Sequence, residues 1–273
     1  MGAKLLVVGG GKMGSALLTG LVASGWATPG ELVVAEPDPQ RRAALAAEHP
    51  GLSVIEAVTP DRVAPGLLGP EGGALLAVKP DVAESACRQL AAVGVTRVLS
   101  IVAGIASLRL EACLPADAVV VRAMPNTPAL VGAGVTVVSG GERATAADLD
   151  WAEGVLGAVG TVVRLPERQL DAVTGVSGCG PAYLFLVAES LIEAGVLVGL
   201  SREVSRTLVV GTLLGSARLL AETGEAPETL RAAVTSPGGA TAAGVRTLEA
   251  RAVRSAFVEA VASATERSRN LGR

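Results

Sequence analysis

A glycine-rich segment near the amino end has the spacing of a phosphate-binding turn. Three glycines stand at the G-x-G-x-x-G spacing, after the apolar run of residues 4–8 and before a helix expected over residues 15–24. The first glycine permits a tight turn, the second lets a pyrophosphate approach the backbone, and the third lets helix and strand pack closely. The free N–H groups of the helix would bind the phosphates. The alternative is a glycine-rich turn without a ligand. The residues predicted to bind the dinucleotide here are Gly9, Gly11, Lys12, Met13 and Gly14.

A carboxylate stands where the ribose of such a cofactor would lie. Glu36 directly follows the second expected strand, residues 32–35. It can accept hydrogen bonds from a ribose 2′-hydroxyl, and it repels a 2′-phosphate by about 1 to 4 kcal/mol at about 4 Å. We therefore expect NADH or NADPH as the cofactor, with NADH favoured. Arg41 and Arg42 are close enough in sequence to pair with a phosphate, or they form a solvated helix face.

Alternating strands and helices must position these residues. Short β-branched or Leu-rich runs alternate with Ala-rich amphipathic stretches, which is the pattern of βαβ units on a parallel sheet. Glycine and proline clusters at residues 59–61 and 69–73 indicate loops. We predict an α/β protein whose Rossmann-type dinucleotide-binding domain spans residues 1–165. The strands are expected at residues 4–8, 32–35, 74–78, 97–100, 119–122, 134–138 and 162–165.

The remainder, residues 166–273, has no strand pattern and predicts an all-α C-terminal domain. Helix breaks are expected at residues 178–181, 199–201, 224–227 and 236–239. The apolar windows 183–200 and 207–221 contain charged residues and lack the flanks of a membrane span, so they predict buried helices. Helices apolar on several faces need cover on every side, which self-association or packing on the sheet domain would provide.

Composition excludes several classes of protein. A net charge of −3 and only five aromatic residues argue against nucleic-acid binding, which needs a basic face and stacking platforms. Because no signal peptide is evident, we expect a cytoplasmic protein without a membrane partner. Three cysteines without Cys-x-x-Cys spacing predict reduced, buried thiols and no metal site. The single histidine, His49, precedes Pro50 and is expected to end a helix, so a catalytic histidine is not predicted.

Several blocks along the chain resemble the pyrroline-5-carboxylate reductase family. The resemblance implies reduction of 1-pyrroline-5-carboxylate to L-proline with a nicotinamide cofactor, the last step of proline biosynthesis. A protonated C=N bond needs positioning of the hydride more than an enzyme acid, which suits a site without histidine. The blocks that carry the resemblance are residues 9–21, 76–80, 100–104, 122–128, 176–183 and 227–249.

The loop of residues 236–241 is predicted to bind the substrate. Its two glycines allow a sharp turn, and successive backbone N–H groups in such a turn form a nest for a carboxylate. The alternative, a helix N-cap with Thr241 in the first turn, uses the same N–H groups. The resemblance implies that Thr241 is catalytic, with its hydroxyl near the ring nitrogen. The predicted substrate-binding residues are Ser236, Gly238, Gly239, Ala240 and Thr241.

Two further segments are expected to line the cofactor. The first, residues 77–80, lies at the carboxyl end of the strand over residues 74–78, where an open parallel sheet binds ligands. The second is the turn of residues 103–104. The resemblance implies that residues 77–80 and the turn of Ala103 and Gly104 contact the ribose and nicotinamide, which makes Lys79 a pocket residue. The alternative is a partly solvated Lys79 before a helix that begins with Pro80. Asn126, between two prolines that fix the backbone of its segment, is expected to tie the loop together and to shape the nicotinamide pocket. Cys179 stands where relatives commonly have Ser, and we interpret it as a small buried thiol. The further predicted cofactor residues are Ala77, Val78, Lys79, Pro80, Ala103, Gly104 and Asn126.

The resemblance also implies an assembly. Members of the family dimerise through the C-terminal helices, complete each active site with a neighbouring subunit, and assemble dimers into rings, here a ring of five.

Two alternative functions have less support from the sequence. A related two-domain reductase acting on another cyclic imine or a 2-hydroxy acid generally uses a Lys, His or Asp for proton transfer, and the helical half has no Lys or His. A non-catalytic NAD-sensing module would carry a partner surface in place of the 236–241 loop.

Overall fold

The computed structural model describes residues 2–64 and 66–271, which form two compact units. The sheet unit comprises Met1–Cys179 and Ser263–Arg273, and the helical unit comprises Gly180–Ala262. The two units are defined by contacts between residues. The boundary predicted between residues 165 and 166 separates two domains, and these contacts do not test it. That boundary therefore stays a prediction.

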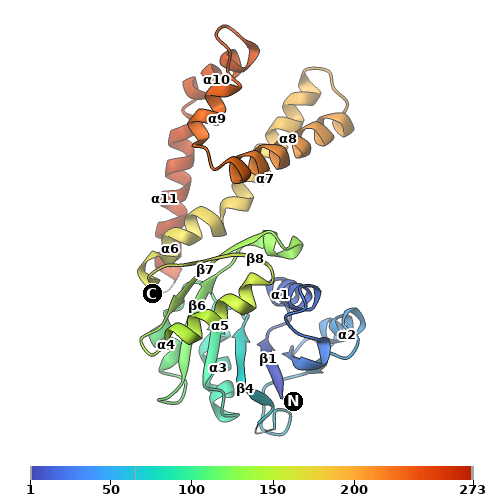
Figure 1. Ribbon diagram of the computed structural model, residues 1–273, viewed down its shortest axis with the longest axis vertical. Coiled ribbons are helices and arrows are strands. Elements are labelled where there is room, and N and C mark those ends of the chain that lie inside the picture. Colours follow the sequence, from blue (N-terminus) through green and yellow to red (C-terminus); the bar gives the residue numbers. More distant parts are fainter. Residues whose placement is uncertain (1, 65, 272–273) are drawn as a thin grey trace. The chain divides into compact units, whose positions relative to one another are not determined.

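The sheet unit contains a single sheet of eight strands within the described residues, in the order β3-β2-β1-β4-β5-β6-β7-β8 (Figure 1). All neighbouring strands pair in parallel except β6 and β7. The strands are β1 Ala3–Val8, β2 Leu32–Ala35, β3 Ser53–Ile55, β4 Leu68–Leu76, β5 Arg97–Ser100, β6 Val119–Met124, β7 Gly134–Gly140 and β8 Gly160–Arg164. A sheet of this kind followed by helices alone confirms the predicted fold class.

Alternation along the strands divides the core into two layers. In β1, Leu5 and Val7 pack on one face of the sheet, and Leu6 and Val8 pack on the other. Helices α1 and α5 cover the first face, and α3 and α4 cover the second. A strand buried on both faces is apolar along its whole length, as the Leu-rich and Val-rich runs predicted. The helices of this unit are α1 Lys12–Ala23, α2 Pro39–Glu48, α3 Ala83–Ala92, α4 Ser107–Glu111, α5 Ala146–Gly157 and α6 Leu170–Val173.

The sheet departs from the prediction in three places. The three-residue strand β3 was not predicted. The glycine-rich residues 69–73 lie within β4 and not in a loop, beside an irregular register between β1 and β4. Strand β7 is antiparallel to β6 because residues 125–133 are fewer than the dozen or so that a parallel crossover needs. The helix expected over residues 15–24 begins three residues earlier, at Lys12.

The helical unit contains α7 Gly180–Leu197, α8 Arg202–Thr223, α9 Pro227–Ala233, α10 Ala240–Ala250 and the start of α11, Val253–Leu271. Helices α7 and α8 form a hairpin in which Ser205 Oγ donates to the carbonyl of Ile192 at 2.9 Å. The approach is close, since a Cβ on Gly195 would overlap the Ser205 side chain. Ser201 caps α8 by accepting the Val204 N–H at 3.2 Å.

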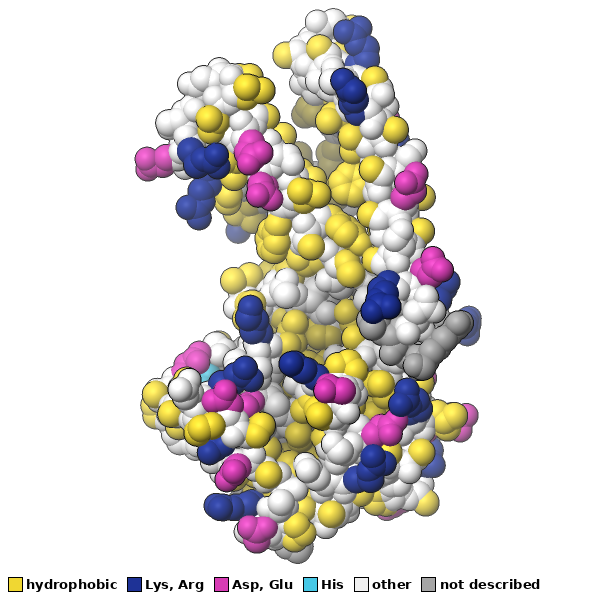
Figure 2. Space-filling view, turned by 180° about the vertical axis from the view of Figure 1, so that it is seen from behind, with side chains coloured by type: hydrophobic (Ala, Val, Ile, Leu, Met, Phe, Trp, Pro, Cys, Tyr) yellow, Lys and Arg dark blue, Asp and Glu magenta, His cyan; other side chains and the backbone are white. Residues whose placement is uncertain are grey.

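The apolar faces of α7 and α8 are not buried within the chain. Among the described residues, helical runs Glu167–Leu197 and Arg202–Thr223 are long and apolar enough to cross a membrane by length and composition alone. Figure 2 shows apolar side chains gathered on the surface of the helices. The prediction of buried helices is therefore wrong for a single chain, while the expectation that these faces need cover remains. The exposed large side chains include Leu184, Phe185, Leu186, Leu197, Val198, Leu208 and Leu214.

The expected break at residues 178–181 is instead a local change of helix type. Helical structure runs from Glu167 to Leu197, with a π-helix over Thr174–Gly178. Pro181 has no N–H to donate, so a regular α-helix would lose a hydrogen bond at this point. Within the π-helix the Cys179 N–H donates to the Thr174 carbonyl, five residues back, at 2.8 Å. Single π-turns of this kind often occur at functional sites.

Candidate cofactor and substrate sites

The predicted cofactor residues gather at one edge of the sheet. They follow the carboxyl ends of β1, β2, β4, β5 and β6, which are consecutive neighbours in the sheet order β2-β1-β4-β5-β6. The chain order reverses between β1 and β4, and open α/β sheets bind ligands outside the carboxyl ends of their strands at such a switch point. The structure therefore brings the predicted cofactor residues to one edge of the sheet, and their contact with a dinucleotide stays a prediction.

The glycine-rich turn has the shape that a pyrophosphate requires. Gly9 has a φ of +103°, and a Cβ there would lie 2.5 Å from the carbonyl oxygen of Ala77. A Cβ on Gly14 would overlap the carbonyl oxygen of Gly9, so the third glycine allows helix and strand to pack. At Gly11 the space is open: no described atom outside its chain neighbours lies within 4 Å of an added Cβ.

Helix α1 begins directly behind that open space. Gly11 is its N-cap and provides no side-chain acceptor for the first N–H groups of the helix. Uncapped N–H groups and the helix dipole attract a phosphate. The exposed Lys12 lies in this first turn, while Met13 packs against the core. These residues fit a dinucleotide, whose phosphates would occupy the space that a Cβ on Gly11 would fill.

Glu36 is a buried carboxylate joined to the glycine-rich turn. Its Oε2 accepts the Gly10 N–H at 2.8 Å, and its Oε1 accepts the Asp38 N–H at 3.0 Å. The Glu36 side chain is only 4% exposed. Each carboxylate oxygen can accept more than one hydrogen bond, so Glu36 retains acceptor capacity for a ribose hydroxyl. Its position directly after β2 is where a ribose-binding carboxylate lies in a Rossmann fold.

The two arginines near Glu36 have different roles. Arg42 Nη1 donates to the carbonyls of Glu36 at 3.0 Å and Pro37 at 2.6 Å, so it holds the loop after β2. Arg41 is largely exposed, and its Nη1 lies 3.9 Å from Glu36 Oε1. Arg41 is therefore the better placed of the two to approach a 2′-phosphate.

The second block of predicted cofactor residues follows β4 and β5. Ala77 and Val78 come directly after β4, which ends at Leu76 and not at residue 78 as expected. Lys79 is exposed and precedes a 3-10 helix that begins at Pro80. After β5, Ala103 lies beside Gly104, which has the left-handed φ of +76° that favours glycine. Contact of these residues with the cofactor stays a prediction.

Both the oxygen and the nitrogen of the Asn126 side-chain amide make hydrogen bonds that hold its loop. Its Oδ1 accepts the Val135 N–H at 2.9 Å, and its Nδ2 donates to the Ser177 carbonyl at 3.1 Å. The side chain therefore connects the loop after β6 to strand β7 and to the π-helix. The tie agrees with the expected role of Asn126, whereas its contact with the cofactor stays a prediction.

One residue of this region was missed in the sequence. The Glu167 carboxylate accepts hydrogen bonds from the backbone and side chain of Ser107, 60 residues away in sequence, and from Arg122, 45 residues away. Burial alone would raise the pKa of Glu167, but the hydrogen bonds from Ser107 and Arg122 lower it below its ordinary value. No local sequence signal points to such distant partners.

The predicted substrate loop lies in the helical unit and forms a turn before α10. The Gly239 N–H donates to the Ser236 carbonyl at 3.1 Å, and Gly238 has a φ of +71°. Gly239 is the N-cap of α10 and offers no side chain to its N–H groups. Ala240 and the exposed Thr241 form the first turn of the helix. The backbone N–H groups at this N-cap are the ones that the predicted anion nest would use, and binding of an anion there stays a prediction.

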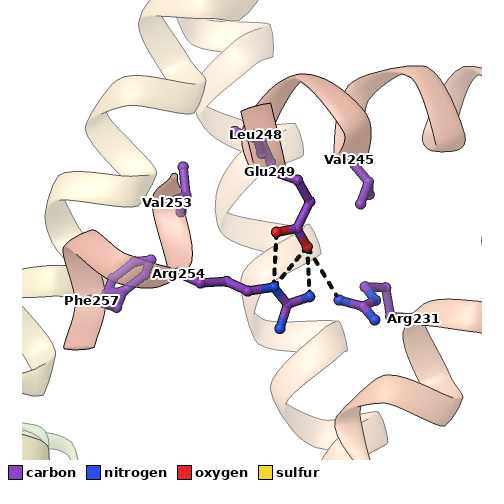
Figure 3. Close-up of a pocket in the computed structure, with 7 residues that line it drawn as sticks. All are labelled: Arg231, Val245, Leu248, Glu249, Val253, Arg254 and Phe257. Carbon is purple, nitrogen blue, oxygen red and sulfur yellow. Dashed lines mark hydrogen bonds and ion pairs between the residues drawn. The ribbon is translucent and has the colours of Figure 1, made fainter. Parts of the chain in front are cut away.

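An ion cluster holds the other end of α10. Figure 3 shows the Glu249 carboxylate facing the guanidinium groups of Arg254 and Arg231. These three residues line a pocket together with Val245, Leu248, Val253 and Phe257. Arg254 Nε donates to Glu249 Oε1 at 2.7 Å, and Arg231 Nη1 lies 3.8 Å from the same oxygen. The hydrogen bond from Arg254 holds the pKa of Glu249 below its ordinary value. Since Arg231 lies on α9 and Arg254 on α11, the cluster ties three helices and fixes the helix that carries Thr241.

The remaining reactive groups do not form a second site. Cys87 is buried, and burial raises the pKa of its thiol to about 12. Cys113 and Cys179 are partly exposed, so the expectation of buried thiols holds only for Cys87. His49 ends α2 as expected. Across residues 2–64 and 66–271, no group of three or more His, Cys, Asp or Glu side chains could hold a metal ion.

A Rossmann-type sheet with a phosphate-binding turn, joined to a helical unit, defines a two-domain nicotinamide-dependent oxidoreductase. Residues 4–104 match the family described as NADP oxidoreductase, coenzyme F420-dependent, and residues 167–271 match the pyrroline-5-carboxylate reductase dimerisation family. The chain is 42% identical over 275 residues to the pyrroline-5-carboxylate reductase of Synechocystis, covering 100% of both proteins. It is 41% identical to that of Mycobacterium tuberculosis, covering 98% of this chain and 97% of the relative. The chain belongs to the pyrroline-5-carboxylate reductase family.

Solved structures agree with this assignment. A pyrroline-5-carboxylate reductase from Coxiella burnetii superposes with a TM-score of 0.89 at 30% identity, covering 100% of both chains. The Plasmodium falciparum pyrroline carboxylate reductase, solved with NADP bound, gives a TM-score of 0.85 at 30% identity and covers 99% of this chain and 98% of that one. The family and the NAD(P)H-dependent enzyme class predicted from the sequence are confirmed, and so is dimerisation through the C-terminal helices.

Proposed function

We propose that the chain reduces 1-pyrroline-5-carboxylate to L-proline with hydride from NAD(P)H, with NADH preferred. One observation carries the reaction: the chain is about 40% identical to pyrroline-5-carboxylate reductases over nearly their full length, and the matched length spans both the phosphate-binding turn and the 236–241 loop. When bound, the reduced nicotinamide supplies the hydride.

The chain's own residues divide the remaining work. The N–H groups at the start of α1 and the open space at Gly11 suit the pyrophosphate. The uncapped N–H groups at the start of α10 suit the carboxylate of the substrate. Thr241, in the first turn of α10, is the proposed partner of the ring nitrogen. The iminium form of the substrate carries its own proton, so these residues orient and bind and need not act as a strong acid.

The preference for NADH rests on Glu36 and Arg42. A buried carboxylate close to the ribose site opposes a 2′-phosphate, because its charge is poorly screened by water. Arg42 is engaged with two backbone carbonyls, which leaves Arg41 as the nearer cation for a phosphate. The charge of Glu36 and the engagement of Arg42 favour a cofactor without the phosphate, whereas Arg41 offsets part of the repulsion between Glu36 and a 2′-phosphate.

A steady-state assay tests the proposal. Purified protein with 1-pyrroline-5-carboxylate should oxidise NADH and form L-proline, with a higher kcat/KM for NADH than for NADPH. The absence of turnover with either cofactor would contradict the proposed reaction. A higher kcat/KM for NADPH would contradict only the preference.

Two finer expectations belong to the same proposal. We infer that dimers assemble into a ring of five, and that the enzyme works in the cytoplasm. The bare apolar faces of α7 and α8 support self-association. Light scattering during size-exclusion chromatography tests the ring, since a plain dimer would elute at a fifth of the mass.

A further inference from the structure

Glu167 collects hydrogen bonds from two other parts of the sheet unit. Its Oε1 accepts the Ser107 N–H at 2.8 Å and Arg122 Nη1 at 2.7 Å. Its Oε2 accepts the Ser107 hydroxyl at 2.6 Å. The side chain of Arg122 is 13% exposed and that of Glu167 is 29% exposed. Both side chains are only partly exposed, so these charge-assisted bonds are stronger than fully exposed ones.

The cluster holds one end of the turn that follows β5. Ser107 is the first residue of α4, and the residue before it, Ala106, has no side-chain acceptor for the free N–H groups of the helix. Glu167 supplies that acceptor from 60 residues further along the chain. At the other end of the turn, the Val102 N–H donates to Ser100 Oγ at 3.3 Å. Residues 101–106 are therefore fixed at both ends.

Arg122 connects the turn to the neighbouring strand. It lies on β6, which pairs in parallel with β5 at Ser100 and Arg122. Because Glu167 binds both Arg122 and Ser107, the turn after β5 is held against the carboxyl end of β6. Ala103 and Gly104, the predicted nicotinamide contacts, lie in the middle of this turn.

We propose that Glu167 is a positioning residue for hydride transfer: it holds the turn of residues 101–106 in the place that the nicotinamide ring requires. The inference rests on the proposed function, since it assumes that this turn contacts the cofactor. Glu167 acts through Ser107 and touches neither cofactor nor substrate. The negative charge matters because three donors converge on its two oxygens, and an amide in its place would present an NH₂ group to one of them.

The test compares two cofactor ligands in Glu167→Gln. ADP-ribose shares the adenosine and pyrophosphate of the cofactor but lacks the nicotinamide. We expect kcat with NADH to fall about ten-fold, the effect of about 1.4 kcal/mol in the transition state. We also expect the Kd for NADH to rise while the Kd for ADP-ribose stays unchanged. A merely structural defect would weaken both ligands alike.

Two further variants sharpen the result. Glu153→Gln is the matched control, because Glu153 also binds an arginine, Arg164, but on α5 and β8 away from the turn. It should keep wild-type kinetics. Ser107→Ala removes only the hydroxyl bond and leaves the N–H bond, so it should lower kcat less and in the same direction, even where Glu167→Gln does not fold.

Two outcomes would overturn the inference. One is wild-type kcat and NADH affinity in Glu167→Gln and Ser107→Ala, and the other is an equal loss of NADH and ADP-ribose affinity in these variants. Turnover by the wild-type enzyme separates the two proposals. If the wild-type enzyme shows no turnover, the proposed function fails. If it does turn over, either of these outcomes counts against the role of Glu167 alone.

Discussion

Asn126 Nδ2 donates to the carbonyl of Ser177 at 3.1 Å, and that carbonyl lies four residues before Pro181. In a regular α-helix the N–H of residue 181 would bond to this carbonyl, but proline has none. The amide of Asn126 therefore replaces a bond that the sequence removes. The loop after β6 and the π-helix are held together by a side chain that serves both.

Replacing Asn126 should destabilise the fold even when the new side chain has nearly the same size. Asn126→Asp removes the donor and places a carboxylate oxygen against the Ser177 carbonyl, so we expect a loss of about 1 to 3 kcal/mol in the free energy of unfolding. Urea unfolding measures it. Asn270→Asp at the exposed end of α11 is the matched control and should change little. Equal stability of the two variants would contradict this role.

Two glycines in the phosphate-binding turn should respond differently to alanine. Gly11→Ala places its methyl in open space, so it should weaken NADH binding about ten-fold or more while leaving thermal unfolding unchanged. Gly14→Ala should impair both, because its methyl overlaps the Gly9 carbonyl. Fluorescence titration measures the affinity for NADH, and a melting curve measures the thermal stability. Gly157→Ala, exposed at the end of α5, is the control; a destabilised Gly11→Ala would show that the space is not open.

Removing the charge of Glu36 should move the preference toward NADPH. Glu36→Gln keeps an acceptor for one of the two backbone N–H groups and loses the repulsion, which corresponds to a change of about 5-fold to 1000-fold in the ratio of affinities. The ratio of kcat/KM for the two cofactors measures it, and Glu36→Ser should act in the same direction. Glu48→Gln, exposed on α2, should leave the ratio alone. An unchanged ratio in both Glu36 variants would mean that another residue reads the ribose.

The hydroxyl of Thr241 should matter for turnover and not for the cofactor. Thr241→Ala should lower kcat by about 100-fold, the effect of misplacing the bound substrate by about 1 Å, with little change in the Kd for NADH. Thr241→Ser should recover part of the rate. Thr247→Ala, on the exposed face of the same helix, is the control. A loss confined to NADH binding would assign Thr241 to the cofactor.

The lowered pKa of Glu167 predicts a stability that depends on acid. A carboxylate with a lowered pKa contributes fully at pH values above its ordinary pKa of 4.5, and the contribution is lost as the pH falls through the lowered pKa. Urea unfolding from pH 7 down to pH values below about 4 should therefore show a steeper loss of stability in the wild type than in Glu167→Gln. Parallel curves would contradict this reasoning.

The sequence predicted the strands well where burial imposes a pattern. Strands at the centre of the sheet, such as β1 and β5, are apolar on both faces and were located within a residue or so. Strand β3 has only three residues, too few for a pattern. The direction of β7 depends on the length of a connection and not on the strand itself, so a reading of runs as βαβ units assumed the wrong direction.

The site residues show the same contrast between those that a local sequence pattern indicates and those whose partners are distant in the sequence. Gly9, Gly11 and Gly14 carry their function in local spacing, and a reader of the sequence can find them. Glu167 carries no such signal, because its partners Ser107 and Arg122 are brought to it only by the folded sheet. Nor does a sequence say whether an apolar helix such as α8 finds its cover inside the chain or outside it.

The bare faces of α7 and α8 have a consequence for how the enzyme behaves on dilution. A hairpin with so few apolar contacts of its own gains much of its folding free energy from a second subunit, so association and folding are thermodynamically linked in this region. Melting temperature then rises with protomer concentration. We therefore expect the helical half to unfold before the sheet when subunits become scarce, because the sheet has a core of its own.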